Sequence, residues 1–173
     1  MSDFVPIDER ADHVRGGAPA TATVLVEYGD YECPYSRRAY RSIQRVEARM
    51  GDGLCFVFRH LPLREIHPHA QLAAEVVEEA GAQGRFWEMH DMLFHRQKAL
   101  ERADMSGYAR ELGLDLDELD AALDDGRHRG RIEADLEGGV MAGARGIPTL
   151  FIDGELYAGS YETDVLQVAL AGR

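Results

Sequence analysis

The sequence predicts an α/β protein with a four-stranded mixed sheet, helices on both faces of that sheet, and an all-helical insert. Two apolar strand patterns joined by one helical pattern come first, and a hairpin followed by a helix comes last. A long helical block lies between them, and its own apolar faces indicate a subdomain rather than a loop. The predicted order of elements is therefore β-α-β, helices, β-β-α.

The first half of the sheet comes from residues 21–64. Residues 21–28 (TATVLVEY) are β-branched or apolar on both faces, which is typical of a strand covered on both sides. Pro34 suits the first position of a helix, and a helical spacing of apolar residues then continues to Met50. Residues 54–60 (LCFVFRH) are a second buried strand. Two such strands joined by one helix predict a parallel, right-handed β-α-β unit.

The middle of the chain is predicted to be helical and the end to return to the sheet. A strand at 148–153 (PTLFID) and another at 155–159 (ELYAG) flank the dipeptide Asp153-Gly154, which is a strong hairpin signal. Proline and glycine positions and apolar spacing place the helices at 68–81, 84–98, 105–112, 116–125, 128–144 and 162–171.

Three parts follow from this pattern. Residues 1–20 are predicted to be an extended, weakly ordered lead-in, and residues 21–64 together with 144–173 form the main domain. Residues 65–143 form the inserted helical subdomain.

Composition narrows the class of protein. The 173 residues include 19 Lys and Arg against 31 Asp and Glu, a net charge of −12, and 45% are hydrophobic. This is a globular composition, and its acidity argues against a nucleic-acid partner or an anionic membrane surface. Two cysteines exclude a disulfide framework. No apolar run approaches a membrane span and the first residues do not resemble a signal peptide, so we expect a cytoplasmic protein without membrane insertion.

Cys33 is the first candidate for chemistry. It ends the loop after the first strand, at the N-cap of the helix that Pro34 begins. Unpaired N–H groups and the positive end of the helix dipole point at such a position, and Arg37 and Arg38 add positive charge. Glu32 opposes this, but its side chain can point to water. The thiolate, the nucleophilic form, is therefore favoured over the alternative of an inert buried cysteine.

Pro148 is the second candidate. It lies in Gly146-Ile147-Pro148-Thr149, at the mouth of an edge strand and after a loop, where a cis X-Pro bond can be accommodated. Taken alone this signal is weak. Together with a Cys-Pro-x-x turn at the other end of the chain it becomes specific.

These stretches resemble a known family. EYGDYECPYS, the helical insert and GIPTLFIDG, over roughly residues 20–172, are similar to the DsbA-like branch of the thioredoxin superfamily. The similarity is greatest to cytoplasmic or antiporter-associated DsbA-like domains, which share the RHLPL and HPHA stretches at 59–63 and 67–70. The resemblance implies a thioredoxin-like fold with an all-helical insert and a thiol–disulfide oxidoreductase.

The resemblance also implies roles for single residues. The cysteine matching Cys33 attacks substrate disulfides, and the proline matching Pro148 is cis and lies against that sulfur. The backbone of the residue before it, here Ile147, pairs with an extended substrate segment. We expect Pro34 and Tyr35, beside Cys33, to be the remaining substrate-binding residues.

Glu27 is a candidate supporting residue, as is Arg37. In the family an acid six residues before the nucleophile lies beneath it, and Glu27 occupies that position. Independently of the family, a Glu inside a strand that is otherwise apolar on both faces predicts a raised pKa. The alternative is an exposed residue on an edge strand.

Ser36 is where the sequence departs from the family. Most members have a second cysteine three residues after the first, and Cys33 and Ser36 cannot form a disulfide. Ser36 can donate a hydrogen bond to the thiolate but cannot resolve a mixed disulfide. Cys55 is predicted to be roughly 15–20 Å from Cys33, beyond the limit of about 7 Å between the Cα atoms of a disulfide. We therefore interpret Cys55 as a core residue.

The sequence thus predicts a monothiol oxidoreductase. The Cys33 thiolate attacks a disulfide-containing protein or a small thiol adduct, and an external thiol releases the mixed disulfide. We expect no bound cofactor, with glutathione or another low-molecular-weight thiol as candidate co-substrate, and no metal, because the histidine spacing matches no metal motif. The chain is expected to be a monomer or a dimer.

Two other classes remain open. One is a non-catalytic thioredoxin-like binding or regulatory module, since loss of the second cysteine is what such a change of role would produce. The other is a glutathione transferase or isomerase similar to the kappa class. Those proteins use a hydroxyl at the position of Cys33, so the match is poor.

Overall fold

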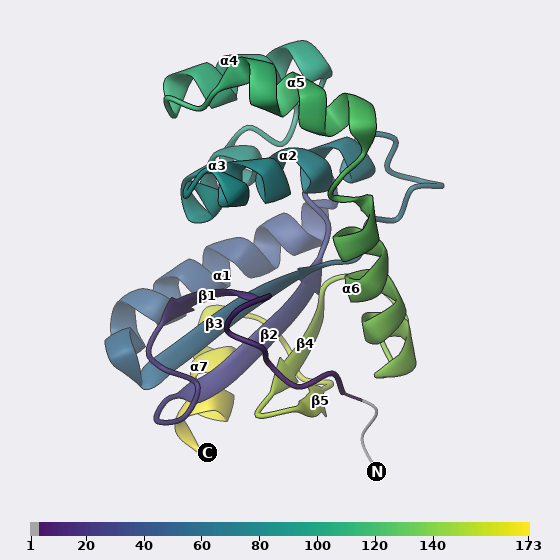
Figure 1. Cartoon of the computed structure of the whole chain (residues 1–173). Helices are drawn as coiled ribbons and strands as arrows, with labels where there is room; N and C mark the ends of the chain where they lie inside the picture. The colour runs from purple at the N-terminus through teal and green to yellow at the C-terminus, as the bar shows by residue number, and fades with distance from the viewer. Residues whose placement is uncertain (1–3) are drawn as a thin grey trace.

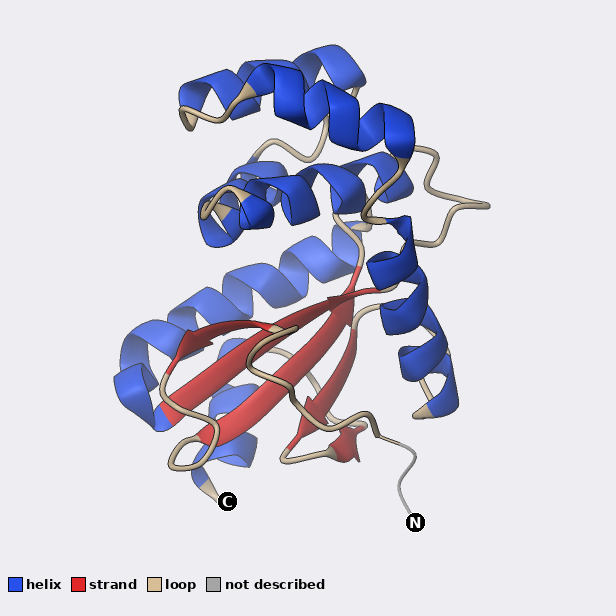
Figure 2. Ribbon diagram, viewed as in Figure 1, coloured by secondary structure: helices blue, strands red, loops and turns tan. Residues whose placement is uncertain are grey.

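A five-stranded sheet with helices on both of its faces is the centre of the computed structural model, which describes residues 4–173 (Figures 1 and 2). The strands are β1 (His13–Gly16), β2 (Thr23–Gly29), β3 (Leu54–His60), β4 (Thr149–Ile152) and β5 (Glu155–Tyr157). The helices are α1 (Pro34–Met50), α2 (Ala70–Ala82), α3 (Phe86–His95), α4 (Arg102–Glu111), α5 (Leu116–Asp125), α6 (Arg129–Met141) and α7 (Thr163–Ala171), with a short 3-10 turn, η1 (Gly51–Gly53), after α1. The predicted fold class is confirmed.

Strand order in the sheet is β1-β3-β2-β4-β5. β2 and β3 pair in parallel with Val26 opposite Val57, as the predicted β-α-β unit requires. β4 pairs antiparallel with β2, and β5 pairs antiparallel with β4 through the predicted Asp153-Gly154 turn. β2 is therefore a central strand with a neighbour on each side, and the loop that follows it starts from the middle of the sheet.

The sheet has one strand more than the four that the sequence predicts. β1 lies in the segment predicted to be a weakly ordered lead-in, and it pairs antiparallel with β3. Its four residues are too few to produce an alternating pattern. Contacts with distant parts of the chain hold it instead: Arg15 pairs with Glu47 and Asp91, and the Trp87 indole N–H donates to the Val14 carbonyl. The prediction for 1–20 was wrong at this strand, and residues 1–3 lie outside the described part.

Two apolar cores separate the faces of the sheet. On one face Leu25, Phe56 and Phe58 pack beneath α1 and α7, and the same cluster continues without a break into α2, α3, α4 and α5. On the other face Val26, Val57 and Phe151 belong to a smaller cluster. Figure 1 shows α6 along that side and the four helices α2–α5 stacked above the upper end of α1. The division into a main domain and an inserted subdomain remains a prediction.

The described chain has all seven helices that the sequence predicts, and one end of each of α3, α4 and α6 differs from its predicted position by three residues. α3 ends at His95, three residues before the predicted end, and a turn follows over residues 96–98. α4 begins at Arg102 rather than 105, because the Asp104 side chain accepts a hydrogen bond from the Glu101 N–H and caps an earlier first turn. The loop between α3 and α4 is consequently placed beside the start of α1.

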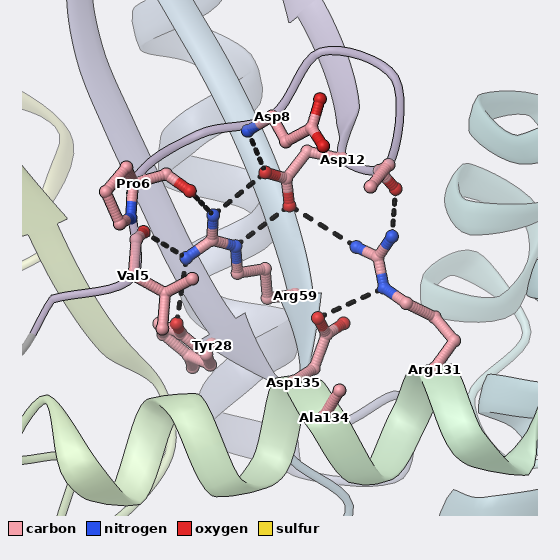
Figure 3. A pocket seen from close by; sticks show the side chains of 10 residues that line it. Val5, Pro6, Asp8, Asp12, Tyr28, Arg59, Arg131, Ala134 and Asp135 are labelled. Carbon is pink, nitrogen blue, oxygen red and sulfur yellow. Dashed lines mark hydrogen bonds and ion pairs between the residues drawn. The ribbon is translucent and has the colours of Figure 1, made fainter.

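Buried charges anchor the segment before β1 to the sheet (Figure 3). The Arg59 guanidinium donates to both Asp12 carboxylate oxygens at 2.9 and 2.8 Å and to the Val5 carbonyl at 2.8 Å. Burial opposes ionisation of Asp12, but the hydrogen bond from Arg59 prevails and lowers the Asp12 pKa. Arg131 of α6 joins the cluster through Asp12 and Asp135. The cavity between these groups is only about 190 Å³, and its charges pair with one another.

Replacing Asp12 by Ala should destabilise the fold strongly. The variant leaves the Arg59 side chain, only 3% exposed, without its carboxylate, and such a loss costs about 3–5 kcal/mol. Denaturant unfolding measures the difference. Asp164→Ala is the control, because its ion pair with Arg49 is at the surface and contributes far less. Equal losses in the two variants would show that the buried cluster does not hold the N-terminal segment.

Candidate functional site

Cys33 occupies the N-cap of α1, and Pro34 is the first residue of that helix, as predicted. The loop from β2 is short, and the Cys33 N–H donates to the Asp30 carbonyl at 3.1 Å. Its thiol is free, and the residue is 3% exposed, which is less than a strand–loop–helix junction led us to expect. The neighbouring α3–α4 loop accounts for this: the Gln97 side chain donates to the carbonyls of Tyr31 and Cys33, each at 2.8 Å.

Pro148 lies at the same end of the sheet as Cys33. The peptide bond between Ile147 and Pro148 is cis. Because Thr149 pairs with Tyr28, the register places Pro148 next to the end of β2, from which the loop to Cys33 departs. A cavity of about 350 Å³ borders Ile147 and Pro148 on the side of β5.

The predicted substrate-binding residues are accessible. Pro34 is exposed, and Tyr35 is 56% exposed although its ring is largely apolar. Ile147 and Pro148 are partly buried. The buried Cys33 is thus bordered by exposed apolar surface on the side of α1, and by the loop before β4 at the same sheet end.

Ser36 has a different partner from the one expected. It is fully buried in the first turn of α1, and its hydroxyl oxygen accepts a hydrogen bond from the Asp30 N–H at 3.2 Å. Among the described residues, no hydrogen bond joins this hydroxyl to the Cys33 sulfur. Ser36 therefore ties the end of the loop to the helix, because the loop amide of Asp30 needs an acceptor once it is buried.

Glu27 is buried in the central strand, which excludes the edge-strand alternative. It is 1% exposed, and neither carboxylate oxygen has a hydrogen-bond partner among the residues that the structure describes. Burial, and then the charge of Glu47, raise its pKa to about 8. Oε1 lies over Gly29, where an added Cβ would stand 2.9 Å away, so a larger residue at position 29 would collide with the carboxyl. A raised pKa for Glu27 is what the sequence predicts.

Two acids of the loop are held by histidines for which the sequence indicates no role at the site. Asp30 accepts from the His67 ring at 2.8 Å and from the Leu63 N–H at 2.9 Å. We had expected the Glu32 side chain to point to water, but it is bonded to His69 instead. It accepts a hydrogen bond from the His69 N–H at 2.7 Å and contacts the His69 ring at 2.9 Å. The hydrogen bond to Glu32 raises the His69 pKa. The two pairs fix the loop before Cys33, and their signal in the sequence was only the HPH motif.

Arg37 lies one turn beyond Cys33, and its N–H donates to the Cys33 carbonyl at 3.1 Å. Its guanidinium reaches the His95 carbonyl at 3.5 Å. Arg38 instead pairs with Glu162 near α7. Of the two arginines predicted to add positive charge at the site, only Arg37 has no recorded carboxylate partner within the described residues.

Cys55 is a core residue, as predicted. It is fully buried in β3 opposite Val24, and burial raises its pKa to about 11. Its thiol is free, like that of Cys33. Cys55 is thus unsuited to nucleophilic chemistry at neutral pH.

The described residues contain neither a metal-binding cluster nor a membrane-spanning helix. Within residues 4–173, no three His, Cys, Asp or Glu side chains gather in a way that could hold a metal ion. In the same part of the chain, none of the helices combines the length and the apolar character needed to cross a bilayer.

The chain is similar to a known protein family and to curated sequences of known proteins. The family model described as Thioredoxin matches residues 9–171. The chain is 45% identical over 167 residues, 96% of its length, to the Na(+)/H(+) antiporter NhaA 1 of Salinispora arenicola. It is 44% identical, over 95% of its length, to the Na(+)/H(+) antiporter NhaA of Herminiimonas arsenicoxydans. It spans about a quarter of these relatives, 25% and 26% respectively.

Solved structures share the fold. A thioredoxin-like oxidoreductase from Silicibacter pomeroyi is 25% identical with a TM-score of 0.82, covering 95% of this chain and 92% of that one. BdbD from Bacillus subtilis, in its oxidised form, has a TM-score of 0.81 at 19% identity, covering 95% and 94%. A periplasmic thioredoxin-like protein from Salmonella enterica serovar Typhimurium has a TM-score of 0.74 at 19% identity, covering 95% and 91%. The last two likenesses concern the fold alone.

Proposed function

Because the chain belongs to the thioredoxin family and has the DsbA-like form of its fold, we propose that it is a thiol–disulfide oxidoreductase of monothiol type. The observation that carries this proposal is the placement of Cys33. It is the N-cap of α1 at the end of a central strand, with the cis Ile147–Pro148 bond at the same sheet end and with Ser36 where a second thiol would stand.

The start of α1 offers unpaired backbone N–H groups to the Cys33 position. No hydrogen bond caps the helix from the Cys33 side chain, and the first turn contains no acidic residue. The helix N–H groups and dipole are therefore available to a negative charge on the sulfur. Asp30 and Glu32, the two nearest acids along the chain, are each bonded to a histidine, which offsets their charge when the histidine is protonated.

The proposed reaction has two exchanges. The Cys33 thiolate attacks a disulfide RS–SR′, the S–S bond breaks, and a Cys33–S–S–R mixed disulfide and R′S⁻ result. A thiolate from solution then attacks the outer sulfur and returns Cys33 as a thiolate, with a new disulfide as the product. Ser36 carries no sulfur and Cys55 is buried in the core, so neither can take the second role.

We propose an extended segment of a disulfide-containing protein as substrate. It would pair with the backbone of Ile147 beside the cis bond, and Pro34 and Tyr35 would contact its side chains. Pairing of this kind resembles strand addition, in which main-chain hydrogen bonds provide affinity and neighbouring apolar surfaces select the side chains. The exposed ring of Tyr35 next to the buried Cys33 supports this arrangement.

A cytoplasmic location is part of the proposal. Release of a monothiol mixed disulfide requires a pool of reduced thiols, which the cytoplasm provides. One similar structure is described as periplasmic, so the fold alone does not decide the compartment.

Rapid reaction of Cys33 with a disulfide reagent tests the proposal. In 5,5′-dithiobis(2-nitrobenzoate) at pH 7, we expect one thiol to react at least about tenfold faster than free glutathione, because the helix N-terminus favours the thiolate. Cys33→Ser should abolish this fast phase, and Cys55→Ala should retain it. Mass spectrometry of the products identifies the modified residue. A Cys33 that reacts no faster than free glutathione contradicts the oxidoreductase.

A second candidate is a regulatory or binding module, favoured by the antiporter relatives of which this chain matches about a quarter. The Cys33→Ser variant distinguishes the oxidoreductase from the binding module. Full biological activity of Cys33→Ser in the native host favours the binding module, whereas its loss favours the thiol chemistry.

A further inference from the structure

A basic cavity lies against the loop that carries Cys33. It measures about 430 Å³, and its lining includes Arg37 of α1, Arg96 and Lys98 of the α3–α4 loop, and Tyr108 of α4. The volume is within the range of small-molecule sites, about 300–1,000 Å³. No acidic residue lines it, although the chain has a net charge of −12. Lys98 is the only lysine in the sequence.

Two of the cations in this basic cavity have no acidic partner among residues 4–173. Arg96 forms a bidentate ion pair with Glu111, with its two guanidinium nitrogens 2.8 and 2.9 Å from the carboxylate oxygens. The guanidinium also lies over the Tyr108 ring. Within the described part of the chain, the Arg37 guanidinium donates to the His95 carbonyl and has no recorded carboxylate partner, and no ion pair is recorded for Lys98. Because the chain as a whole has a net charge of −12, two unpaired cations in one cavity are distinctive and favour an anionic ligand.

The cavity is joined directly to the backbone of Cys33. Gln97, which also lines the cavity, donates to the Cys33 carbonyl at 2.8 Å. Arg37 lies one helical turn beyond Cys33, and its own N–H donates to the same carbonyl. Residues four apart share a helix face, so a ligand held by Arg37 lies on the side of the helix from which Cys33 departs.

We propose that this basic cavity binds the carboxylates of the external thiol, so that the co-substrate is an anionic low-molecular-weight thiol rather than a neutral or cationic one. The inference rests on the proposed monothiol function and adds the site and the charge of its second substrate. Carboxylates bind Lys98 and Arg37, which holds the thiol next to the Cys33 mixed disulfide. The thiolate attacks the outer sulfur of Cys33–S–S–R, the S–S bond breaks, and free Cys33 thiolate and the new disulfide leave.

The kinetic test compares two thiols on a preformed adduct. The protein with Cys33 in a mixed disulfide with neutral 2-mercaptoethanol is mixed with glutathione, which is anionic, or with cysteamine, which is cationic. Quenched mass spectrometry follows the loss of the adduct and identifies each product. After correction for thiolate concentration we expect glutathione to react about tenfold faster, to saturate, and to slow as ionic strength rises.

Lys98→Gln is the test variant. It should lower the glutathione rate about three- to tenfold and leave the cysteamine rate unchanged. Arg45→Gln is the matched control, since it removes one positive charge from an exposed position of α1 farther along the helix and should change neither rate. Equal slowing for both thiols in Lys98→Gln, or an equal effect of Arg45→Gln, overturns the inference.

Binding of S-methylglutathione, which cannot exchange, separates this inference from the proposed function. Calorimetry should show binding to the wild type and weaker binding to Lys98→Gln. Absence of binding overturns the basic cavity as a ligand site even if Cys33 forms mixed disulfides rapidly. Binding with an unreactive Cys33 instead supports the cavity and contradicts the oxidoreductase.

Discussion

A Ser36→Cys variant is expected to release a Cys33 mixed disulfide without an external thiol, because the introduced cysteine forms a disulfide with Cys33. The two positions are three residues apart at the start of α1, which places their Cα atoms roughly 5–6 Å apart, within disulfide range. The substitution removes the hydroxyl that accepts the Asp30 N–H, a modest loss because sulfur is a weak acceptor that can partly replace it.

The effect on the mixed disulfide should be large. An adjacent thiol attacks intramolecularly, so we expect release at least about 10³-fold faster than with 1 mM glutathione acting on the wild type. Stopped-flow mixing and trapping by acid measure the lifetime of the adduct. The wild-type adduct should persist until external thiol is added, because Ser36 has no sulfur to attack it.

Ser42→Cys is the matched control for this variant. Ser42 is buried on the same helix but lies nine residues beyond Cys33, roughly 13 Å along the axis, so it cannot reach the adduct. If Ser42→Cys also shortens the lifetime, protein unfolding rather than local resolution explains the result. If Ser36→Cys fails to shorten it while its disulfide forms, the monothiol interpretation of the wild type is wrong.

Replacing Glu27 by Leu should stabilise the protein most strongly at alkaline pH. In the folded state burial raises the pKa of this carboxyl to about 8, whereas its value is near 4.5 when exposed. Between these values the unfolded chain has lost the proton and the folded chain still holds it, so the wild-type free energy of unfolding falls as pH rises from about 4.5 to 8. The destabilisation is complete above pH 8, where it is on the order of 5 kcal/mol.

The Leu variant removes this pH dependence. Its side chain is similar in volume and needs no hydrogen bond, whereas both Glu27 oxygens lack partners. Urea unfolding at pH 5, 7 and 8.5 should show a gain over the wild type that grows with pH. Glu133→Leu is the control, because Glu133 pairs with Arg64 at the surface and should leave the pH profile unchanged. A gain that is constant with pH would contradict the raised pKa.

The same variant tests why an unpaired acid is kept in the central strand. If Glu27 supports the thiol chemistry, Glu27→Leu is more stable yet forms or releases the Cys33 adduct more slowly, with an altered pH profile. Functional groups held in unfavourable surroundings show this exchange of stability for activity. An unchanged rate at every pH would leave Glu27 without a supporting role.

Much of the fold could be predicted because its signals are local. The strands at 21–28 and 54–60 are apolar on both faces, and proline and glycine mark the helix ends, so neighbouring residues alone carry the pattern. The position of Cys33 at the N-cap of α1 could also be predicted locally, because Pro34 indicates where the helix begins. Glu27 could be recognised because it interrupts an apolar run.

The missed features depend on residues that meet only after folding. β1 is too short to show periodicity and is held by Glu47, Asp91 and Trp87. The hydrogen bonds between Asp30 and His67 and between Glu32 and His69 each join residues that are 37 positions apart in the sequence. The sequence around these acids and histidines contains no signal that identifies their partners, so their pairing could not be predicted.

The sequence by itself therefore determined the order of elements from β2 onward, the position of Cys33 at the start of α1, and the lack of a second thiol three residues after it. The tertiary structure alone decided the fifth strand, the partners of Asp30, Glu32 and Ser36, and the joining of Arg37 to the α3–α4 loop in one basic cavity. The physical reason is the sequence separation of the interacting residues. Helix caps and apolar periodicity involve residues a few positions apart, whereas polar pairing depends on which distant segments packing brings together.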